Sequence, residues 1–339
     1  MSRRGLLLVN LGTPEKPTLS AVRSYLREFL TDPRVIDIPL LARFFLVYLV
    51  IVPFRASKSL SAYLKVWQAD GSPLLFYSQR FKDKLDKKIG DRYSIEIAMR
   101  YGKPSIKEAL KKFKKIGIND IQVVPLFPQY STASWGSAAA KVLLEASKGW
   151  NTPALSFTPP FYSNGEYISA ICENTKPFLE QYRYDKILIS FHGLPERHIH
   201  KSDEMKGECN IADCCLSEEK EAPYCYRAHC FKTAKLIAKQ LGIAEDHFQV
   251  CFQSRLGRSQ WLTPYFDKIV ETCLENEKRN LLIISPSFVS DCLETIEEVG
   301  ITAKKAFLKS GGDRFDCVPA LNDYDHWVEG FTKIINPND

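Results

Sequence analysis

Short apolar runs rich in strand-forming residues alternate along the chain with segments whose apolar residues recur at helical spacing. Eight runs predict strands, at residues 6–10, 94–99, 121–126, 154–157, 186–191, 248–252, 281–285 and 315–319. Strands that alternate with helices form parallel sheets, because each helix carries the chain back to the same edge. The spacing separates two sets of four strands, which predicts an α/β fold with two parallel sheets flanked by helices.

Two of the predicted helices carry recognisable end signals. Ser105 and Glu108 form a capping-box pattern at the start of one helix, and Gly117 follows its apolar stripe as a stop signal. Thr18 opens another helix, whose apolar face begins at Leu19. These signals lie between predicted strands, as crossover helices require.

The longest connection in each half follows the first strand of that half. The first half carries an apolar insertion at 38–54, and the second carries a cysteine-rich insertion at 200–230. We therefore predict one domain over 1–165, a second over 166–310, and a last strand and C-terminal helix over 311–339. Open α/β sheets bind ligands at the carboxyl ends of their strands, so we expect the two insertions to frame one cleft.

Composition narrows the class of protein. The 339 residues are 45% hydrophobic, which is enough for two cores without covalent staples. A net charge of +6, without a long basic block, gives no case for nucleic acid. The apolar run near the N-terminus is too short for a signal peptide, so we expect a cytoplasmic protein with reduced thiols.

The apolar insertion at 38–54 has two interpretations. Its uninterrupted run after Arg43 is eleven residues and contains Pro53, whereas a spanning helix needs roughly 20, so we expect that it does not span a membrane. It is either a buried helix or an interfacial segment anchored by Arg43, Arg55 and Lys58. An interfacial segment would place the protein peripherally on the cytoplasmic membrane.

Two groups of residues could carry acid–base chemistry. His192 directly follows a strand, where its imidazole could act as a base or a ligand, or be a satisfied histidine in a turn. Asp291, Glu294 and Glu298 follow another strand with spacings that place them on one helix face. Such a face can pass protons or hold a cation, but acidic residues also simply complement a helix dipole.

Seven blocks of the chain, in order, resemble those of the ferrochelatases, lyases that insert ferrous iron into a porphyrin to make haem. The blocks are LLLVNLGTPEKP, LREFLTDPRVIDIP, AMRYGKPSI, VVPLFPQYS, SFHGLPERH, FQSRLGRSQWLTPY and SFVSDCLETIEE. The resemblance runs nearly from end to end. It implies two Rossmann-like domains with protoporphyrin IX bound between them, and ferrous iron as the second substrate.

The resemblance assigns roles to individual residues. His192 matches the catalytic histidine, Glu294 the glutamate that faces it across the porphyrin, and Glu298 lies one turn deeper; His192 and Glu294 would meet the iron. Cys292 departs from the pattern, because some members have a histidine there. Four residues match blocks of the porphyrin pocket: Arg100, Tyr101, Tyr130 and Ser131.

The cysteine-rich insertion resembles one way in which some members hold a two-iron two-sulfur cluster. Such a cluster takes four thiolates, and five of the ten cysteines lie here. Cys209, Cys214, Cys215 and Cys225 are the first choice, with Cys230 replacing one of the adjacent pair as the second. The stretch lacks the C-x-x-C pattern of zinc sites, which makes zinc or unligated thiols the alternatives.

Other functions remain open at this stage. The protein could act on coproporphyrin, insert another metal such as cobalt, or be a non-catalytic haem-binding or redox-sensing relative. The presence of both His192 and Glu294 favours an enzyme, because a binding module needs neither. The sequence leaves the oligomeric state open.

Overall fold

A computed structural model describes residues 3–203, 209, 214–215, 222–255, 257 and 259–336. The rest of the cysteine-rich insertion lies outside the described residues, as do residues 256 and 258 of one of the seven blocks. All eight predicted strands are confirmed: β1 (Arg4–Thr13), β2 (Tyr93–Gly102), β3 (Asp120–Pro125), β4 (Ala154–Phe157), β5 (Lys186–His192), β6 (Phe248–Gln253), β7 (Asn280–Ile284) and β8 (Arg314–Cys317).

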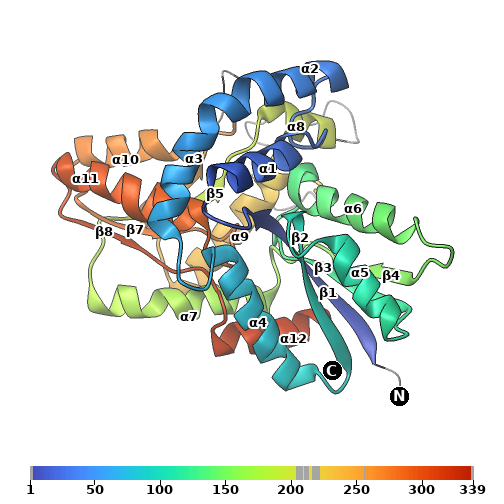
Figure 1. Cartoon of the computed structure of the whole chain (residues 1–339). Coiled ribbons are helices and arrows are strands. Elements are labelled where there is room, and N and C mark those ends of the chain that lie inside the picture. Colours follow the sequence, from blue (N-terminus) through green and yellow to red (C-terminus); the bar gives the residue numbers. More distant parts are fainter. Residues whose placement is uncertain are drawn as a thin grey trace.

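The strands form two parallel four-stranded sheets that share one topology. Their orders are β2-β1-β3-β4 and β6-β5-β7-β8, and β5 pairs with β6 from Ile187 opposite Phe248 to His192 opposite Gln253. In each sheet the chain changes direction beside the first strand, between β1 and β3 and between β5 and β7. Ligands of open α/β sheets bind at such switch points. Figure 1 shows the sheets side by side, with helices around them.

Helices connect the strands and cover the sheets. Their bounds are α1 (Leu19–Leu30), α2 (Leu40–Phe45), α3 (Val52–Val66), α4 (Pro73–Ile89), α5 (Ile106–Lys115), α6 (Ser137–Ala146), α7 (Gly165–Gln181), α8 (Glu196–Ser202), α9 (Tyr226–Leu241), α10 (Phe266–Glu275), α11 (Lys304–Lys309) and α12 (Asp325–Ile335). Three segments are π-helical, η1 (Leu46–Ile51), η2 (Thr132–Gly136) and η4 (Glu294–Ala303), and η3 (Glu245–His247) is a 3-10 turn.

The predicted helix signals are confirmed. Ser105 and Glu108 make both hydrogen bonds of a capping box on α5, and the Thr18 hydroxyl accepts from the Ala21 amide at the start of α1. Gly117 has a φ of 75°, a left-handed conformation that favours glycine and ends α5.

One continuous core joins the two sheets. Leu6 and Leu8 of β1 belong to the same buried cluster as Ile187 and Ile189 of β5. The last helix, α12, packs against both α4 and α7, and the Ile335 carbonyl accepts from a Gln122 side chain on β3. The C-terminal helix therefore contacts the first sheet although the last strand belongs to the second. The domain boundaries stay a prediction.

The apolar insertion forms an unbroken helix over Leu40–Val66, made of α2, η1 and α3; in Figure 1 α2 lies at the top and α3 runs down from it. By length and composition alone, its 27 residues are long and apolar enough to cross a membrane. The length of the apolar run therefore underestimated the length of the helix. Pro53 does not break it, because the residue stands in the first turn of α3 after a π-helical segment.

The exposure of this helix distinguishes the two interpretations of the sequence. Only 22% of its most apolar stretch is buried, whereas a core helix would be mostly buried. The interpretation as a buried helix is therefore wrong for this stretch. Val52, Ala56 and Tyr63 pack into a core cluster that includes α1, so one face of α3 belongs to the first domain. The anchoring role predicted for Arg43 is wrong, because its buried guanidinium donates to the carbonyls of Ile36 and Ile38.

Candidate active site

His192 lies at the carboxyl end of β5, beside the switch point of the second sheet. Its amide donates to the Ser287 hydroxyl at 3.2 Å, and its carbonyl accepts from the Tyr226 hydroxyl at 2.8 Å. Gly193 follows in close contact with Gln253, where a Cβ atom would approach the Gln253 carbonyl oxygen to 2.9 Å. Both backbone polar groups of His192, its amide and its carbonyl, are therefore hydrogen-bonded to side chains.

The imidazole of His192 has a defined proton arrangement. Nδ1 lies 2.6 Å from the Gly193 carbonyl oxygen. A carbonyl only accepts, so Nδ1 carries the hydrogen and Nε2 of the neutral ring keeps its lone pair. This arrangement suits a residue that takes up a proton at Nε2, and His192 is half-buried rather than enclosed in the core.

Glu298 of η4 completes an acid–base group with His192 and Glu294. Burial raises the pKa of Glu298, the Ser254 hydrogen bond and the charge of His192 oppose the rise, and the charge of Glu294 adds to it. A carboxyl group with a raised pKa exchanges its proton closer to neutral pH. These interactions bring together the three residues that the sequence predicted as catalytic.

Ser254 was not predicted, and it holds Glu298 in place. Its hydroxyl donates to the Glu298 carboxylate, and its φ of 63° is uncommon for a residue other than glycine. Strained backbone of this kind persists where the surrounding structure constrains it, commonly at functional sites. The sequence offers no signal for it, because a serine after a strand is ordinary.

Asp291 does not belong to the acidic face that the sequence predicted. Its carboxylate accepts from Thr295 and from the side chain of Asn322, so it secures the start of the helix against the loop before α12. The spacing was misleading because Asp291 lies before the helix, which begins only at Leu293, so helical spacing does not relate it to Glu294. Cys292 is buried, and burial raises the pKa of its thiol.

Two tyrosines of the first domain lie near Glu294, and the sequence analysis missed both. Burial raises the pKa of Tyr25 on α1 and of Tyr63 on α3, and the charge of Glu294 adds to both shifts. Each phenol therefore stays neutral beside the carboxylate. Nζ of Lys65 on α3 also lies 2.7 Å from Oε1 of Glu297, so the apolar helix forms an ion pair with the acidic π-helix.

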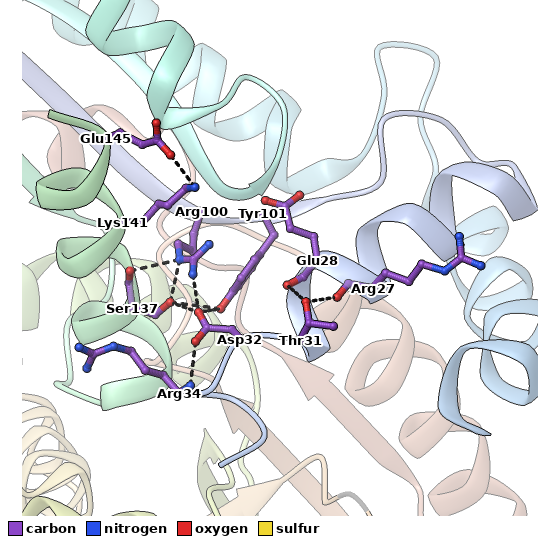
Figure 2. A network of polar contacts seen from close by, with 10 residues as sticks. All are labelled: Arg27, Glu28, Thr31, Asp32, Arg34, Arg100, Tyr101, Ser137, Lys141 and Glu145. Carbon is purple, nitrogen blue, oxygen red and sulfur yellow. Dashed lines mark hydrogen bonds and ion pairs between the residues drawn. The ribbon is translucent and has the colours of Figure 1, made fainter. Parts of the chain in front are cut away.

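Arg100 and Tyr101 belong to a buried network around Asp32, which Figure 2 shows. The Asp32 carboxylate accepts from the Arg100 guanidinium, from the Tyr101 hydroxyl at 2.8 Å and from the Ser137 hydroxyl. These contacts hold the loop after α1 against β2 and α6. The Arg100 guanidinium and the Tyr101 hydroxyl are both hydrogen-bonded within this network. Contact of either residue with a substrate stays a prediction.

Replacement of Asp32 by asparagine should lower the free energy of unfolding by about 3 kcal/mol at pH 7, because Arg100 would lose its buried counter-charge. Burial opposes ionisation of Asp32, but hydrogen bonds from Ser137 and the Arg34 amide and the charge of Arg100 hold its pKa below the usual value of 3.8. A lowered pKa stabilises the fold above the unfolded-state value and ceases to do so as pH falls. Urea denaturation at several pH values measures this.

The gap between wild type and the Asp32→Asn variant should therefore narrow below about pH 4. Glu271→Gln is the matched control, because Glu271 pairs with Lys268 on the exposed surface and its loss should leave the urea midpoint unchanged. A gap that stays constant down to pH 3 would show that Asp32 is not ionised in the folded protein.

Tyr130 and Ser131 follow β3, beside the switch point of the first sheet. The Tyr130 amide donates to Nδ1 of His229 at 3.1 Å, and its ring lies 5.0 Å from that of Tyr224 and 5.7 Å from that of Trp135. Ser131 is buried, and its hydroxyl accepts from the Ser134 amide at the start of η2. Tyr130 thus lies in an aromatic group, whereas Ser131 has a capping role.

The cysteine sulfurs of the insertion lie close together. Sγ of Cys214 is 3.9 Å from that of Cys209 and 3.6 Å from that of Cys215, which is 3.6 Å from that of Cys225. Within the described ranges, no three His, Cys, Asp or Glu side chains are arranged to hold a metal ion as they stand. Cys230 is fully buried one turn along α9.

The cleft predicted between the insertions stays a prediction. A cavity beside Phe288, which contacts the His192 ring edge-on at 6.3 Å, has a volume of about 10 Å³. This is room for about one water molecule, and far too small for a macrocycle.

Solved structures with the same fold include chelatases. SirB from Bacillus subtilis with Fe3+ has a TM-score of 0.56 and 11% identity, with 98% of this chain and 94% of that chain covered. At this identity the likeness shows the fold alone. It agrees with two Rossmann-like domains of parallel strands flanked by helices.

Closer relatives share sequence as well as fold. A ferrochelatase from Legionella pneumophila (strain Lens) is 43% identical over 336 residues, which cover 98% of this chain and 99% of the relative. A ferrochelatase from Coxiella burnetii (strain CbuK_Q154) is 41% identical over 330 residues, 97% of this chain and 92% of the relative. The ferrochelatase family model matches residues 3–339, and the chain belongs to that family.

Proposed function

We propose that the protein inserts ferrous iron into protoporphyrin IX to form protohaem, the terminal step of haem biosynthesis. The observation that carries this proposal is that Glu298, a buried carboxyl group with a raised pKa, interacts electrostatically with both His192 and Glu294. Insertion replaces two pyrrole N–H protons by one dication, so the reaction releases two protons. A base and a second proton carrier are the groups that this stoichiometry requires.

His192 is the proton acceptor in this proposal. Its Nε2 lone pair is available because Nδ1 donates to the Gly193 carbonyl, and the same carbonyl stabilises the imidazolium that forms. The hydrogen bonds to both backbone groups of His192 keep the ring oriented toward the substrate.

Glu294 and Glu298 provide a path for the second proton or for the entering metal. Carboxylates are hard oxygen donors that can receive a dication and can also pass protons along a row. The raised pKa of Glu298 suits a group that takes up and releases a proton at each turnover. Pyrrole proton and ferrous ion would thus travel in opposite directions past the same two side chains.

The decisive assay mixes purified protein with protoporphyrin IX and ferrous iron without oxygen and follows conversion of the porphyrin spectrum to that of haem. Parallel reactions with a coproporphyrin and with cobalt test the alternative substrates. Preferred turnover of coproporphyrin would change the substrate but keep the reaction class. Haem binding without any insertion would instead favour the non-catalytic alternative.

We also propose that α2 and η1 rest on the cytoplasmic membrane, where a hydrophobic porphyrin partitions. Large apolar side chains are exposed along this helix, including Leu41 at 84%, Phe45 at 63% and Leu49 at 60%. An exposed apolar patch of this kind is typical of a membrane or protein contact. The helix continues into α3, which contacts η4, so a porphyrin leaving the membrane would arrive beside Glu294.

Replacing Leu41, Phe45 and Leu49 together by serine should release the protein from liposomes and raise the apparent KM for protoporphyrin. Each side chain loses about 1.5–3 kcal/mol of apolar burial at the membrane, so binding should weaken by at least about 100-fold. Vesicle flotation measures the first effect and steady-state kinetics the second.

A matched control removes equally exposed apolar side chains elsewhere. Leu143, Leu144 and Trp150, on and after α6, are exposed at 52%, 53% and 99%, and serine at these positions should leave flotation unchanged. If the wild-type protein does not float with vesicles, the helix serves another contact.

We propose that Cys209, Cys214, Cys215 and Cys225 hold a two-iron two-sulfur cluster. The four sulfurs lie in a row in which neighbours are 3.6–3.9 Å apart, so the four thiols that such a cluster takes are gathered in one place. The Ala228 amide donates to Cys225 Sγ, and buried Arg227 donates to Cys215, as an anionic centre requires. The cluster would stabilise the insertion, and zinc remains the alternative.

A further inference from the structure

The loop between β7 and η4 contacts His192 at one point and leads directly to Glu294. The Ser287 hydroxyl accepts from the His192 amide at 3.2 Å, and the Phe288 ring meets the imidazole edge-on at 6.3 Å between centroids. The same loop continues through Asp291 to the helical turn that carries Glu294. The course of this loop therefore determines where Glu294 lies relative to His192.

Asn322, in the turn before α12, holds the later part of this loop by three hydrogen bonds. Its backbone amide donates to the Val289 carbonyl at 2.8 Å, its Oδ1 accepts from the Asp291 amide at 2.8 Å, and its Nδ2 donates to the Asp291 carboxylate at 2.7 Å. Asn322 is 4% exposed, so water does not readily replace these bonds. One side chain thus fixes both the backbone and the carboxylate of Asp291.

The turn that carries Asn322 is held in a strained conformation. The φ of Asn322 is 47°, a left-handed value that is uncommon for residues other than glycine and that asparagine tolerates better than most. The next residue, Asp323, is buried and forms ion pairs with Arg80 and Lys84 of α4. Such strain persists where surrounding contacts constrain the backbone, commonly at functional sites. The turn is therefore a fixed support for the loop.

Asp291 extends this support to the first turn of the acidic helix. Its Oδ1 accepts from the Thr295 hydroxyl at 2.8 Å, and the same hydroxyl accepts from the Cys292 amide at 3.0 Å. Thr295 directly follows Glu294, so these hydrogen bonds enclose the turn from which the Glu294 side chain projects.

We infer that Asn322 is a positioning residue, which sets the place of Glu294 relative to His192 by holding Asp291 and the loop before it. For its kinetic readout only, this role rests on the proposed function. Asn322 does not act on the substrate, because its side chain is buried and bonded at both ends to Asp291. Asp291 in turn acts through its hydrogen bonds and not through the place of its charge.

Exchanging the two side chains tests this role. Asn322→Asp alone sets two carboxylates against each other and removes a donor, so kcat should fall about tenfold while the KM for protoporphyrin stays within about twofold. The swapped variant, Asp291→Asn with Asn322→Asp, keeps a donor and acceptors for every bond of the pair and moves only the charge. It should recover kcat to within about threefold of wild type. A swapped variant as slow as Asn322→Asp would overturn the inference and give the charge of Asp291 a direct part in the reaction.

Asn322→Gly provides a second variant, because glycine adopts the left-handed φ without strain and only the side-chain bonds are lost. It should show the same fall in kcat. Asn280→Ala is the matched control: Asn280 bonds to Asp185 at 3.1 Å at the start of β7, the opposite end of that strand from the loop. It should lower the urea midpoint without changing kcat. Wild-type kcat in Asn322→Gly, or an equal fall in both variants, would contradict the positioning role.

Hydrogen exchange gives a readout that does not depend on turnover. In Asn322→Asp, amide exchange should accelerate over residues 289–296, and the swapped variant should reverse this change. Asn280→Ala should leave exchange in this segment unchanged. Wild-type exchange over 289–296 in Asn322→Asp would overturn the inference.

Failure of the positioning role is distinguishable from failure of the proposed function. Wild-type protein that never inserts iron, together with accelerated exchange that the swap reverses, would contradict the chelatase function and support the role of Asn322. Wild-type protein that inserts iron, together with full activity of Asn322→Asp, would contradict the positioning role alone.

Discussion

His192→Ala should reduce iron insertion by about 10²–10⁴-fold, because the variant lacks the side chain proposed to take up a pyrrole proton. Protoporphyrin binding should stay within about tenfold of wild type, since the role proposed for His192 is proton uptake rather than burial of the porphyrin ring. Anaerobic absorbance kinetics measure the first quantity, and quenching of porphyrin fluorescence measures the second. Near-normal turnover would remove His192 from the mechanism.

A second histidine provides the control for this experiment. His247 lies in the 3-10 turn before β6 with its side chain 58% exposed, and His247→Ala should leave both quantities unchanged. Glu294→Gln is the companion variant, because it keeps the shape of the side chain and deletes its charge. It should also lower turnover strongly, and an unchanged rate across the pH range would assign Glu294 a purely structural role.

With the proposed cluster, protein purified without oxygen should be reddish-brown, and Cys209→Ser should bleach it. The content of iron and of acid-labile sulfide should fall from about two each per chain to near zero, because serine is a poor ligand for an iron–sulfur cluster. Cys209 is half-buried at one end of the row of sulfurs, so the substitution disturbs little packing. Metal analysis, labile-sulfide assay and visible absorbance measure the result.

Cys230→Ser separates the two possible sets of ligands. Cys230 is fully buried in the core cluster around α9, and this variant should keep its colour if Cys209, Cys214, Cys215 and Cys225 are the ligands. Bleaching by Cys230→Ser would support the alternative set. One zinc per chain with no labile sulfide would contradict the iron–sulfur cluster and leave the ferrochelatase family unaffected.

Two local predictions from the sequence were incomplete for the same reason. The acidic spacing placed Asp291 with Glu294, but hydrogen bonds to Asn322 and Thr295 draw its carboxylate away. The apolar run ended at Phe54, but the helix continues through α3 because its later turns pack against α1. In both cases partners distant in sequence decided the outcome, and no local pattern contains them.

The sequence by itself determined the eight strands, their grouping into two sets and the helix caps, because these depend on local periodicity and on contacts within a few residues. It also placed His192 at a strand end and five of the ten cysteines in one insertion. The tertiary structure alone decided what surrounds these residues. Ser254 contacts Glu298, Tyr226 contacts His192, and Asp32 contacts Arg100 across 44, 34 and 68 residues of sequence. Such pairs form only when the two sheets and their connecting helices have packed, so their geometry cannot be read from spacing along the chain.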